Sequence, residues 1–322
     1  MKRYTASTYN WTKQLAIIIG CILILSNQAK ASADNIIKQN KNNNHNVQSH
    51  QFWNQHFNSN KNSGYPVIFI HGINATLADW EQTVNLISSA NYCTMSYQKE
   101  NKNWIDKRGN QHCIIWNIRY YEPNLVKELL IGNLTRYANR LKEMITLIKQ
   151  QTQQDKVILI AHSMGGLVAR AYMNIDKESW NSVHKILTVG TPHKGVPIAP
   201  PIINHWRDLH KNSKFITSLN KAWKKQLESG YKQWGVVGAI NLKKYPSPKH
   251  IKATSTDSGG PSYIQISSSI PFGEWKEAIK NKIDIPTLNT THFGYRVYTN
   301  NHHDGLLFDK TVLQAIIWAT SP

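Results

Sequence analysis

The sequence is poor in acidic residues, in cysteine and in long apolar runs. Its 322 residues include 19 Asp and Glu against 38 Lys and Arg, so the formal net charge is +19. With 3 cysteines, the chain is not one of the small scaffolds that disulfides hold together. Its longest apolar run, from Leu15 to Leu25, is shorter than the roughly 18 to 20 residues that a membrane-spanning helix needs. The 40% hydrophobic content excludes a disordered chain and fits one sizeable globular domain.

The apolar run near the start has the features of an export signal. Three basic residues precede it, and a series of small residues ending at Ala33 follows it. A basic start, a short apolar centre and small residues at the cleavage site are typical of a secretory signal peptide. We therefore expect residues 1–33 to be removed and the protein to be secreted or periplasmic. An uncleaved N-terminal anchor and a lipoprotein signal with Cys21 are the alternatives.

Further expectations concern the segment after the predicted signal and the two cysteines beyond it. Residues 34–64 are rich in Asn, Gln, Ser and His, with too little apolar area to offset the entropy of ordering, which predicts a flexible leader. The folded domain should then span residues 65–322. In an oxidising compartment, Cys93 and Cys113 are expected to form a disulfide, with two buried free thiols as the alternative.

The positive net charge indicates which kinds of molecule the protein could bind. Without residues 1–33, which hold four Lys or Arg and no acidic residue, the net charge is still +15. Such a field favours anionic partners, among them the headgroups of an anionic membrane or a cell surface. Nucleic acid is not expected, because no binding motif accompanies the charge. The alternative is that the cations simply cover a solvated surface.

The chain alternates strand-like and helix-like segments from Tyr65 onward. Six short β-branched or apolar runs have the composition of strands that are buried on both faces of a parallel sheet. They are Pro66–Ile70, Cys113–Ile118, Lys156–Ala161, His184–Val189, Trp234–Ile240 and Tyr295–Thr299. Apolar residues recur at steps of three and four between Asn124 and Gln151, which predicts a crossover helix. The pattern predicts an α/β fold with a mostly parallel central sheet flanked by helices.

A serine interrupts this pattern at an informative place. Ser163 lies between the strand that ends at Ala161 and a helix predicted to run from Gly165 to Met173. A serine on a tight strand-to-helix turn needs small neighbours, because the helix passes close by, and Gly165 and Gly166 supply them. Such a turn presents the hydroxyl at the carboxyl ends of the strands, where α/β folds bind ligands.

Four segments in order resemble the α/β-hydrolase superfamily, in particular bacterial lipases and esterases whose nucleophile elbow has the sequence AHSMGG. They are VIFIHGIN (Val67–Asn74), AHSMGG (Ala161–Gly166), VGTPHKG (Val189–Gly195) and HHDGLL (His302–Leu307). The resemblance implies the α/β-hydrolase fold, a serine nucleophile with a catalytic triad, and an oxyanion hole. One departure is Ala161, which stands where the elbow commonly has Gly.

The resemblance and the chemistry of acyl transfer assign the same roles. Serine is a weak nucleophile, so a histidine must remove its proton, and a carboxylate must hold that histidine in one tautomer. Ser163 is the expected nucleophile and His303 the expected base, with His302 as its neighbouring alternative. The backbone amides of Ile73 and Met164 are expected to form the oxyanion hole.

The triad acid must lie between the serine and the histidine along the chain, after a strand. Asp257 is the first acidic residue after the run that ends at Ile240, and its glycine-containing loop resembles the acid loop of the family. Glu274 is the second candidate, and Asp284 and Asp304 follow it. A turn residue that bonds its own backbone is the alternative role for Asp257.

Residues 196–230 separate two predicted strands and are a candidate lid or cap insertion. Its aromatic residues Trp206, Phe215 and Trp223 either contact acyl chains of a substrate or pack the insertion onto the domain.

These features predict a secreted serine carboxylic-ester hydrolase, a lipase that cleaves acylglycerols or related lipid esters through an acyl-enzyme, without a redox cofactor or a required metal. An acyltransferase or thioesterase on the same scaffold is one alternative. A catalytically silent, basic surface-binding protein is another. A metal site at His302, His303 and Asp304 is disfavoured, because no second ligand pair with metal-site spacing is present in the sequence.

Overall fold

The computed structural model describes most of the chain beyond its first fifty residues. The predicted signal peptide, residues 1–33, lies outside the described part. Residues from Phe52 to Pro322 form one compact unit. The described residues are 51–57, 62–73, 76–88, 92–98, 102–107, 113–122, 128, 131–197, 204–228, 233–257, 264–280 and 283–322.

One sheet organises this unit, and its interior strands are parallel. Within the described residues it has nine strands in the order β3-β2-β4-β1-β5-β6-β7-β9-β8. The edge strands β3 and β8 pair antiparallel with their neighbours. The strands are β1 (Val67–Ile70), β2 (Cys93–Gln98), β3 (Lys102–Lys107), β4 (Ile115–Arg119), β5 (Val157–His162), β6 (Val183–Val189), β7 (Trp234–Ala239), β8 (Thr287–Leu288) and β9 (Tyr295–Thr299). The predicted fold class is confirmed.

All six predicted strands are present, and three further strands were missed by the sequence analysis. The missed strands are β2, β3 and β8, which lie at or next to the two edges of the sheet. β2 has the sequence CTMSYQ and β3 has KNWIDK. Strands near an edge need not be buried on both faces, so their sequences lack the continuous apolar run that marked the interior strands.

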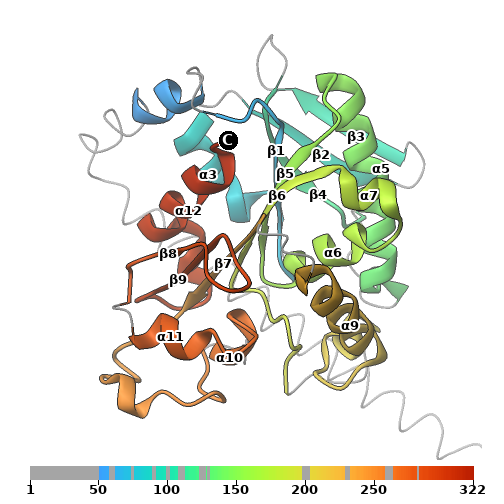
Figure 1. Ribbon diagram of the computed structural model, residues 1–322. Coiled ribbons are helices and arrows are strands. Elements are labelled where there is room, and N and C mark those ends of the chain that lie inside the picture. Colours follow the sequence, from blue (N-terminus) through green and yellow to red (C-terminus); the bar gives the residue numbers. More distant parts are fainter. Residues whose placement is uncertain are drawn as a thin grey trace, which may run out of the picture. The chain divides into compact units, whose positions relative to one another are not determined.

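Helices cover both faces of the sheet, with α3 and α12 on one face and α5, α6 and α7 on the other (Figure 1). The α-helices are α3 (Ala78–Ser88), α5 (Leu134–Thr152), α6 (Met164–Met173), α7 (Lys177–Asn181), α8 (Asn204–Leu209), α9 (Lys214–Glu228), α10 (Ile266–Ser269), α11 (Trp275–Lys280) and α12 (Lys310–Thr320). Two 3-10 turns are η1 (Pro248–His250) and η2 (Asp304–Phe308).

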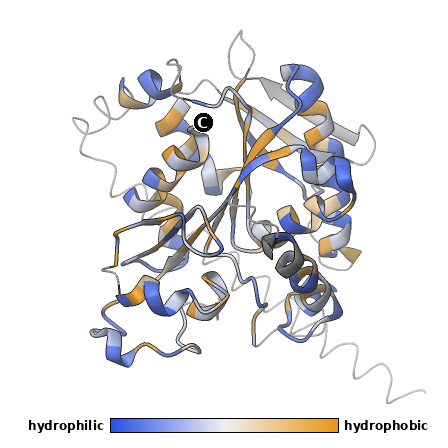
Figure 2. Ribbon diagram, viewed as in Figure 1, coloured by the Kyte–Doolittle hydropathy of each residue, from blue (hydrophilic) through white to orange (hydrophobic). Residues whose placement is uncertain are grey.

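Two apolar cores fill the layers, because each strand sends alternate side chains to opposite faces. In β5, Ile158 and Ile160 belong to the core that includes α3 and α12, while Leu159 and Ala161 belong to the core that includes α5 and α6. Figure 2 shows the hydrophilic residues, in blue, on the outer parts of the helices. Burial on both faces holds β5 rigidly and so fixes the end of the strand from which the serine turn starts.

The crossover helix begins later than the sequence predicted. α5 starts at Leu134 rather than at Asn124, because the side chain of Asn133 caps it by accepting a hydrogen bond from Arg136 N at 2.8 Å. The helix ends at Gln153, which adopts the left-handed conformation with φ 53°. α5 connects β4 to β5, so the predicted crossover between parallel strands is present.

Two described stretches of the predicted leader, residues 52–57 and 62–64, belong to the same compact unit as the domain, whereas residues 34–50 of the leader lie outside the described part. Residues 51–57 are helical, and Trp53 is 3% exposed within the core that includes α12. The ring Nε2 of His56 lies 2.8 Å from Thr320 Oγ1. This short stretch contains large aromatic side chains, and their burial offsets the entropy of ordering it.

The two cysteines beyond the predicted signal form the expected disulfide. Cys93 and Cys113 are bonded, with a sequence separation of 20 residues. Cys93 begins β2 and Cys113 precedes β4, and these two strands are parallel neighbours. The bond therefore closes a loop that contains the whole of β3, an edge strand.

Removing this bond should destabilise the fold without moving the serine turn. The double variant Cys93→Ala/Cys113→Ala is expected to lose about 3 kcal/mol of unfolding free energy, the chain-entropy value for a loop of this length. Urea unfolding of the variant and the wild type measures the difference. An unchanged midpoint, or two free thiols in the mass spectrum of the wild-type protein, would refute the structural role.

Candidate active site

The turn that carries Ser163 joins a fully buried strand to a helix in a strained conformation. β5 ends at His162, α6 begins at Met164, and Ser163 between them has φ 53° and ψ −127°. A positive φ is costly for a residue with a side chain, so the surroundings must hold it in place. Ser163 N donates a hydrogen bond to Val189 O at 2.8 Å, which ties the turn to the end of β6. The serine is thereby fixed at the carboxyl ends of the parallel strands.

The start of α6 is packed so closely that two glycines are required. A Cβ on Gly165 would lie 2.3 Å from His71 O, and a Cβ on Gly166 would lie 2.0 Å from Thr191 Oγ1. Both distances are shorter than real contacts allow. The two glycines therefore let the helix begin directly against the segments that follow β1 and β6, as the sequence analysis expected.

The structure brings His303 and Asp257 together. His303 Nδ1 lies 2.8 Å from Asp257 Oδ2, and the two residues are 3% and 0% exposed. The imidazole packs on Gly190, where an added Cβ would lie 2.9 Å from ring atoms of His303. Gly190 directly follows the residue whose carbonyl accepts the Ser163 N–H. The buried pair therefore lies beside the serine turn, and a histidine that donates Nδ1–H to a carboxylate keeps Nε2 free as a base.

His302, the alternative to His303, has a different environment. It is exposed, and its ring Nδ1 accepts a hydrogen bond from Gly305 N at 3.1 Å. Its neighbour His303 is the one that reaches Asp257.

A second aspartate organises the loop on which His303 lies. Asp309 Oδ2 accepts hydrogen bonds from Thr299 Oγ1 and Asn301 Nδ2, both at 2.8 Å. Its Oδ1 accepts from Thr311 N at 2.7 Å and so caps α12. The carboxylate thus links the end of β9 to the start of α12 across the loop of His303. The sequence analysis did not find Asp309, although an Asp just before an apolar helix is a cap signal that predicts part of this role.

Charge and burial act in opposite directions on the two partners. Burial lowers the pKa of His303, but the charge and hydrogen bond of Asp257, with a further contribution from Asp304, outweigh burial and raise the pKa above its ordinary value of 6.5. Burial raises the pKa of Asp257, while the charge and hydrogen bond of His303 oppose that rise. Burial lowers the pKa of His71 to about 4 and that of His162 well below its ordinary value. These two imidazoles are therefore neutral at pH 7 and add no positive charge beside His303.

The segment after β1 lies against the serine turn, as an oxyanion loop must. A Cβ on Gly72 would lie 3.0 Å from Ser163 Cβ, so the two backbones are close neighbours. Ile73 follows Gly72, and Met164 is the first residue of α6, where helix N–H groups lack partners within the helix. The segments that carry the two predicted amide donors thus both adjoin Ser163.

A tyrosine supports the oxyanion loop and was not found from the sequence. Tyr120 OH donates to His71 O at 3.1 Å, and its ring stacks on the His71 imidazole with centroids 4.1 Å apart. Both residues are fully buried. This contact holds the peptide that precedes Gly72. No local motif marks Tyr120, because its role arises from the pairing of β4 with β1.

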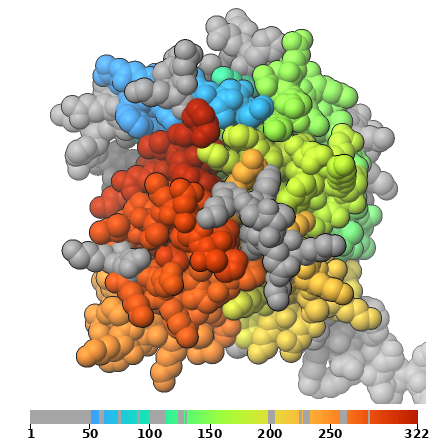
Figure 3. Space-filling model, viewed as in Figure 1, coloured from blue at the N-terminus to red at the C-terminus, as the bar shows by residue number. Residues whose placement is uncertain are grey.

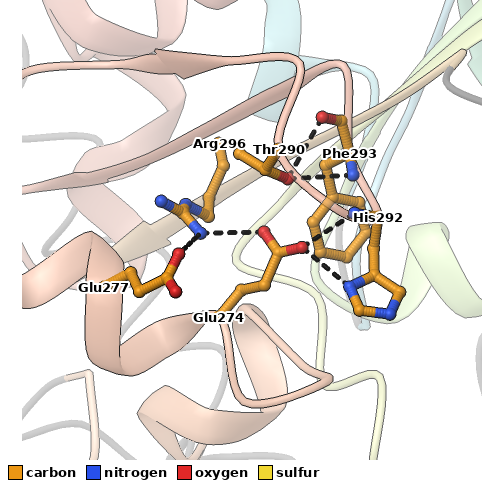
Figure 4. Close-up of polar contacts among 6 residues, drawn as sticks. All are labelled: Glu274, Glu277, Thr290, His292, Phe293 and Arg296. Carbon is orange, nitrogen blue, oxygen red and sulfur yellow. Dashed lines mark hydrogen bonds and ion pairs between the residues drawn. The ribbon is translucent and has the colours of Figure 1, made fainter.

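Glu274, the second candidate for the triad acid, is occupied elsewhere. Figure 4 shows its carboxylate between Arg296 and His292. Glu274 Oε2 lies 2.8 Å from Arg296 Nη1, and Oε1 lies 2.8 Å from His292 Nδ1. Arg296 also contacts Glu277 Oε2 at 3.2 Å. Because Glu274 and Arg296 are both buried, this ion pair fixes α11 against β9.

The two remaining acid candidates have other environments. Asp284 Oδ1 accepts a hydrogen bond from Asn300 N at 2.9 Å. Asp304 is exposed at the start of η2. Of the four acids that the sequence offered, Asp257 is the one with a hydrogen bond to His303.

The insertion between β6 and β7 contains two helices, α8 and α9, and Trp223 packs α9 onto the domain. Trp223 is 1% exposed, and its ring lies 5.1 Å from Trp234 and 3.8 Å from the Arg170 guanidinium. Of the two roles that the sequence left open for Trp223, its burial in the core fits the packing role. Trp206 and Phe215 are half-buried against the same core.

Arg170 connects this insertion to the nucleophile helix. Its guanidinium donates to Leu219 O at 3.1 Å, to Asn220 Oδ1 at 3.0 Å and to His193 Nδ1 at 3.2 Å. His193 Nε2 in turn lies 3.0 Å from Thr188 Oγ1. Since Nδ1 accepts from an arginine, His193 is neutral and carries its proton on Nε2. This chain of bonds was not predicted, because it joins three separate segments of the sequence.

Two negative findings apply to the described residues. In that part of the chain, no group of three or more His, Cys, Asp or Glu side chains is placed to hold a metal ion. Among the same residues, no helix combines the length and the apolar composition that a membrane span requires.

The chain is similar in sequence and in fold to known proteins. Residues 61–259 match the model of the PGAP1-like alpha/beta domain family. A GPI inositol-deacylase of Coccidioides immitis is 38% identical over 63 residues, which is 17% of this chain and 6% of that protein. The lin2722 product of Listeria innocua superposes with a TM-score of 0.51 at 13% identity, covering 79% of this chain and 92% of that one. The mature lipase BlEst2 of Bacillus licheniformis gives a TM-score of 0.47 at 12% identity, covering 82% and 94%. The chain belongs to the PGAP1-like alpha/beta domain family and has the α/β-hydrolase fold.

Proposed function

We propose that the protein is a serine carboxylic-ester hydrolase that cleaves acylglycerols or related lipid esters through an acyl-enzyme. The observation that carries the proposal is the strained Ser163 turn beside the buried His303–Asp257 pair, whose atoms are 2.8 Å apart. A serine becomes nucleophilic when a histidine accepts its proton and a carboxylate orients that histidine.

The residues have distinct roles in the acylation step. Ser163 Oγ attacks the carbonyl carbon of the ester while His303 Nε2 accepts the hydroxyl proton. Asp257 accepts a hydrogen bond from His303 Nδ1–H and stabilises the imidazolium. The N–H groups of Ile73 and Met164 donate hydrogen bonds to the oxygen on which negative charge develops.

The attack forms a tetrahedral intermediate. Its collapse breaks the ester bond, and His303 gives its proton to the leaving alcohol. Water then attacks the acyl-enzyme, with His303 again accepting a proton. The carboxylic acid leaves, and the proton returns to Ser163. Each step uses side chains and backbone amides of the chain itself.

The comparisons favour a lipid ester as the substrate class. The fungal relatives are GPI inositol-deacylases, which supports an ester between an acyl group and a polyol hydroxyl, with the polyol as the leaving alcohol. The matched segments are 6% and 4% of those proteins, so the proposal for this chain is the bond type and not their full substrate. Export through the predicted signal of residues 1–33 would bring the enzyme to lipids outside the cytoplasm. An acyltransferase would use the same acyl-enzyme, and a panel of esters with added alcohol acceptors separates the two activities.

Replacing the nucleophile tests the proposal. Ser163→Ala should lower kcat/KM on p-nitrophenyl esters by about 10³-fold or more, because no acyl-enzyme can form. Circular dichroism should be unchanged, since the hydroxyl contributes little packing. Residual activity within about tenfold of the wild type would show that Ser163 is not the nucleophile.

Two carboxylate variants separate a catalytic role from a structural one. Asp257→Asn should lower kcat by orders of magnitude, about 10⁴-fold in the limiting case, because the amide no longer holds the required histidine tautomer. Glu274→Gln should leave kcat nearly unchanged but lower the unfolding free energy by about 3 kcal/mol, since it weakens the buried pair with Arg296. Steady-state kinetics and urea unfolding measure both, and the reverse ranking would assign the triad acid to Glu274.

The activity should depend on pH through His303. The base must be neutral, so kcat/KM should rise with pH along a limb whose apparent pKa lies above 6.5, because Asp257 raises the pKa of His303. In Asp257→Asn that charge is lost, and the limb of the residual activity should move to lower pH. Identical limbs in the two proteins would contradict the assignment of this pair.

A further inference from the structure

The excess positive charge of the domain is concentrated in one part of the chain. Residues 191–264 contain 12 Lys or Arg and 3 Asp or Glu. The rest of the domain, residues 65–190 and 265–322, contains 19 Lys or Arg and 15 Asp or Glu and is nearly balanced. A charge excess that was simply a solvated surface would be spread over the whole domain.

Seven lysines of this part form what we call the basic rim. They come from the segment after β6, the segment before and at the start of α9, and the segment after β7. All seven are exposed: Lys194, Lys211, Lys214, Lys243, Lys244, Lys249 and Lys252. In Figure 3 the yellow segment of residues 204–228 and the orange segment of residues 241–257 lie along the same lower edge of the molecule.

Hydrogen bonds join the three segments of the basic rim. Lys211 N donates to Val196 O at 3.0 Å, which connects the α9 segment to the one after β6. Lys194 N donates to Ser268 Oγ at 2.8 Å, which connects that segment to α10. In α10, Ser267 Oγ donates to Ala253 O at 2.6 Å, next to Lys252. These bonds hold the three segments of the rim together.

The basic rim adjoins the proposed catalytic residues. Lys244 Nζ lies 3.0 Å from Thr256 Oγ1, and Thr256 precedes Asp257 in the chain. Lys194 follows the turn after β6 whose Gly190 packs on His303. Both segments leave the carboxyl ends of parallel strands. The rim therefore lies at the end of the sheet where Ser163 follows β5.

Acidic groups within the segment do little to neutralise the basic rim. Asp257 is fully buried against His303. Asp208 accepts a hydrogen bond from Leu134 N at 3.0 Å and is half-buried. The sequence from 209 to 227 and that from 241 to 256 contain no Asp or Glu at all.

We propose that the basic rim docks the domain onto an anionic lipid bilayer, with the carboxyl ends of the parallel strands, and thus Ser163, facing the membrane. The inference rests on the proposed function, because an enzyme for lipid esters must reach substrate that is held in a bilayer. Several lysines near an anionic surface attract it additively, each strengthening binding by about fivefold. The attraction falls off within a Debye length, about 10 Å at 0.1 M salt, so the lysines that face the membrane contribute most.

Vesicle sedimentation of the full chain tests this docking without requiring turnover. The wild type should bind vesicles of phosphatidylcholine mixed with phosphatidylglycerol, and it should not bind phosphatidylcholine alone. Raising the salt from about 0.1 M to about 0.5 M should release it, because charge attraction is screened. Since binding is measured separately from hydrolysis, a failure of the docking proposal is distinguishable from a failure of the proposed activity.

Matched charge reversals locate the binding surface. Lys249→Glu/Lys252→Glu changes the rim, and Lys156→Glu/Lys177→Glu changes net charge equally near the amino ends of β5 and β6. The rim variant should bind anionic vesicles at least about tenfold more weakly, while the control should stay within about twofold of the wild type. Hydrolysis of a short soluble ester should be the same in all three proteins.

Three results would overturn the proposal. One is absence of wild-type binding to anionic vesicles. The second is an equal loss in both variants, which would mean that net charge alone attracts the protein. The third is that the rim variant keeps its affinity for vesicles but loses affinity for a soluble anionic polymer, which would assign the rim to a cell-surface polymer instead.

Discussion

The geometry of the site depends on one steric constraint, the contact between the first turn of α6 and the backbone that follows β1 and β6. This contact is so close that a side chain at position 165 or 166 would not fit, so both residues are glycine. Ser163 is held at a positive φ by its hydrogen bond to the end of β6. The strain is sustained because β5 is buried on both faces by two apolar cores. A serine on a looser turn would lose the fixed distance to a general base.

The parallel sheet explains why residues from four distant segments meet at this turn. Parallel strands end at the same edge, so the loops after β1, β5, β6, β7 and β9 are gathered there. The loops after β7 and β9 bring Asp257 and His303 together, and Asp309 fixes the second of them. The same edge also carries the loops of the basic rim, which is why chemistry and surface charge occur on one side of the domain.

The sequence predicted the interior of the fold and the residues on local motifs, because both leave local patterns. Continuous apolar runs marked all six interior strands that were named, and the small residues around Ser163 marked its turn. The strands β2, β3 and β8, at or next to the edges of the sheet, were missed, because strands there need not be buried on both faces and lack such a run. Tyr120 and Arg170 were missed, and the role of Trp223 was left open, because their roles depend on contacts between segments far apart in sequence. The choice between Asp257 and Glu274 as the triad acid required the structure. In it Asp257 bonds His303, and Glu274 forms a buried ion pair with Arg296.

The central claim is that Ser163 is a nucleophile activated by a buried His303–Asp257 pair. The most direct measurement is covalent labelling of the folded protein with a fluorophosphonate, followed by peptide mass spectrometry. The account predicts one adduct per chain, on the peptide at Ser163, formed much more slowly in Asp257→Asn than in Glu274→Gln. Folded wild-type protein that remains unlabelled at Ser163, or that is labelled at another serine, would contradict it.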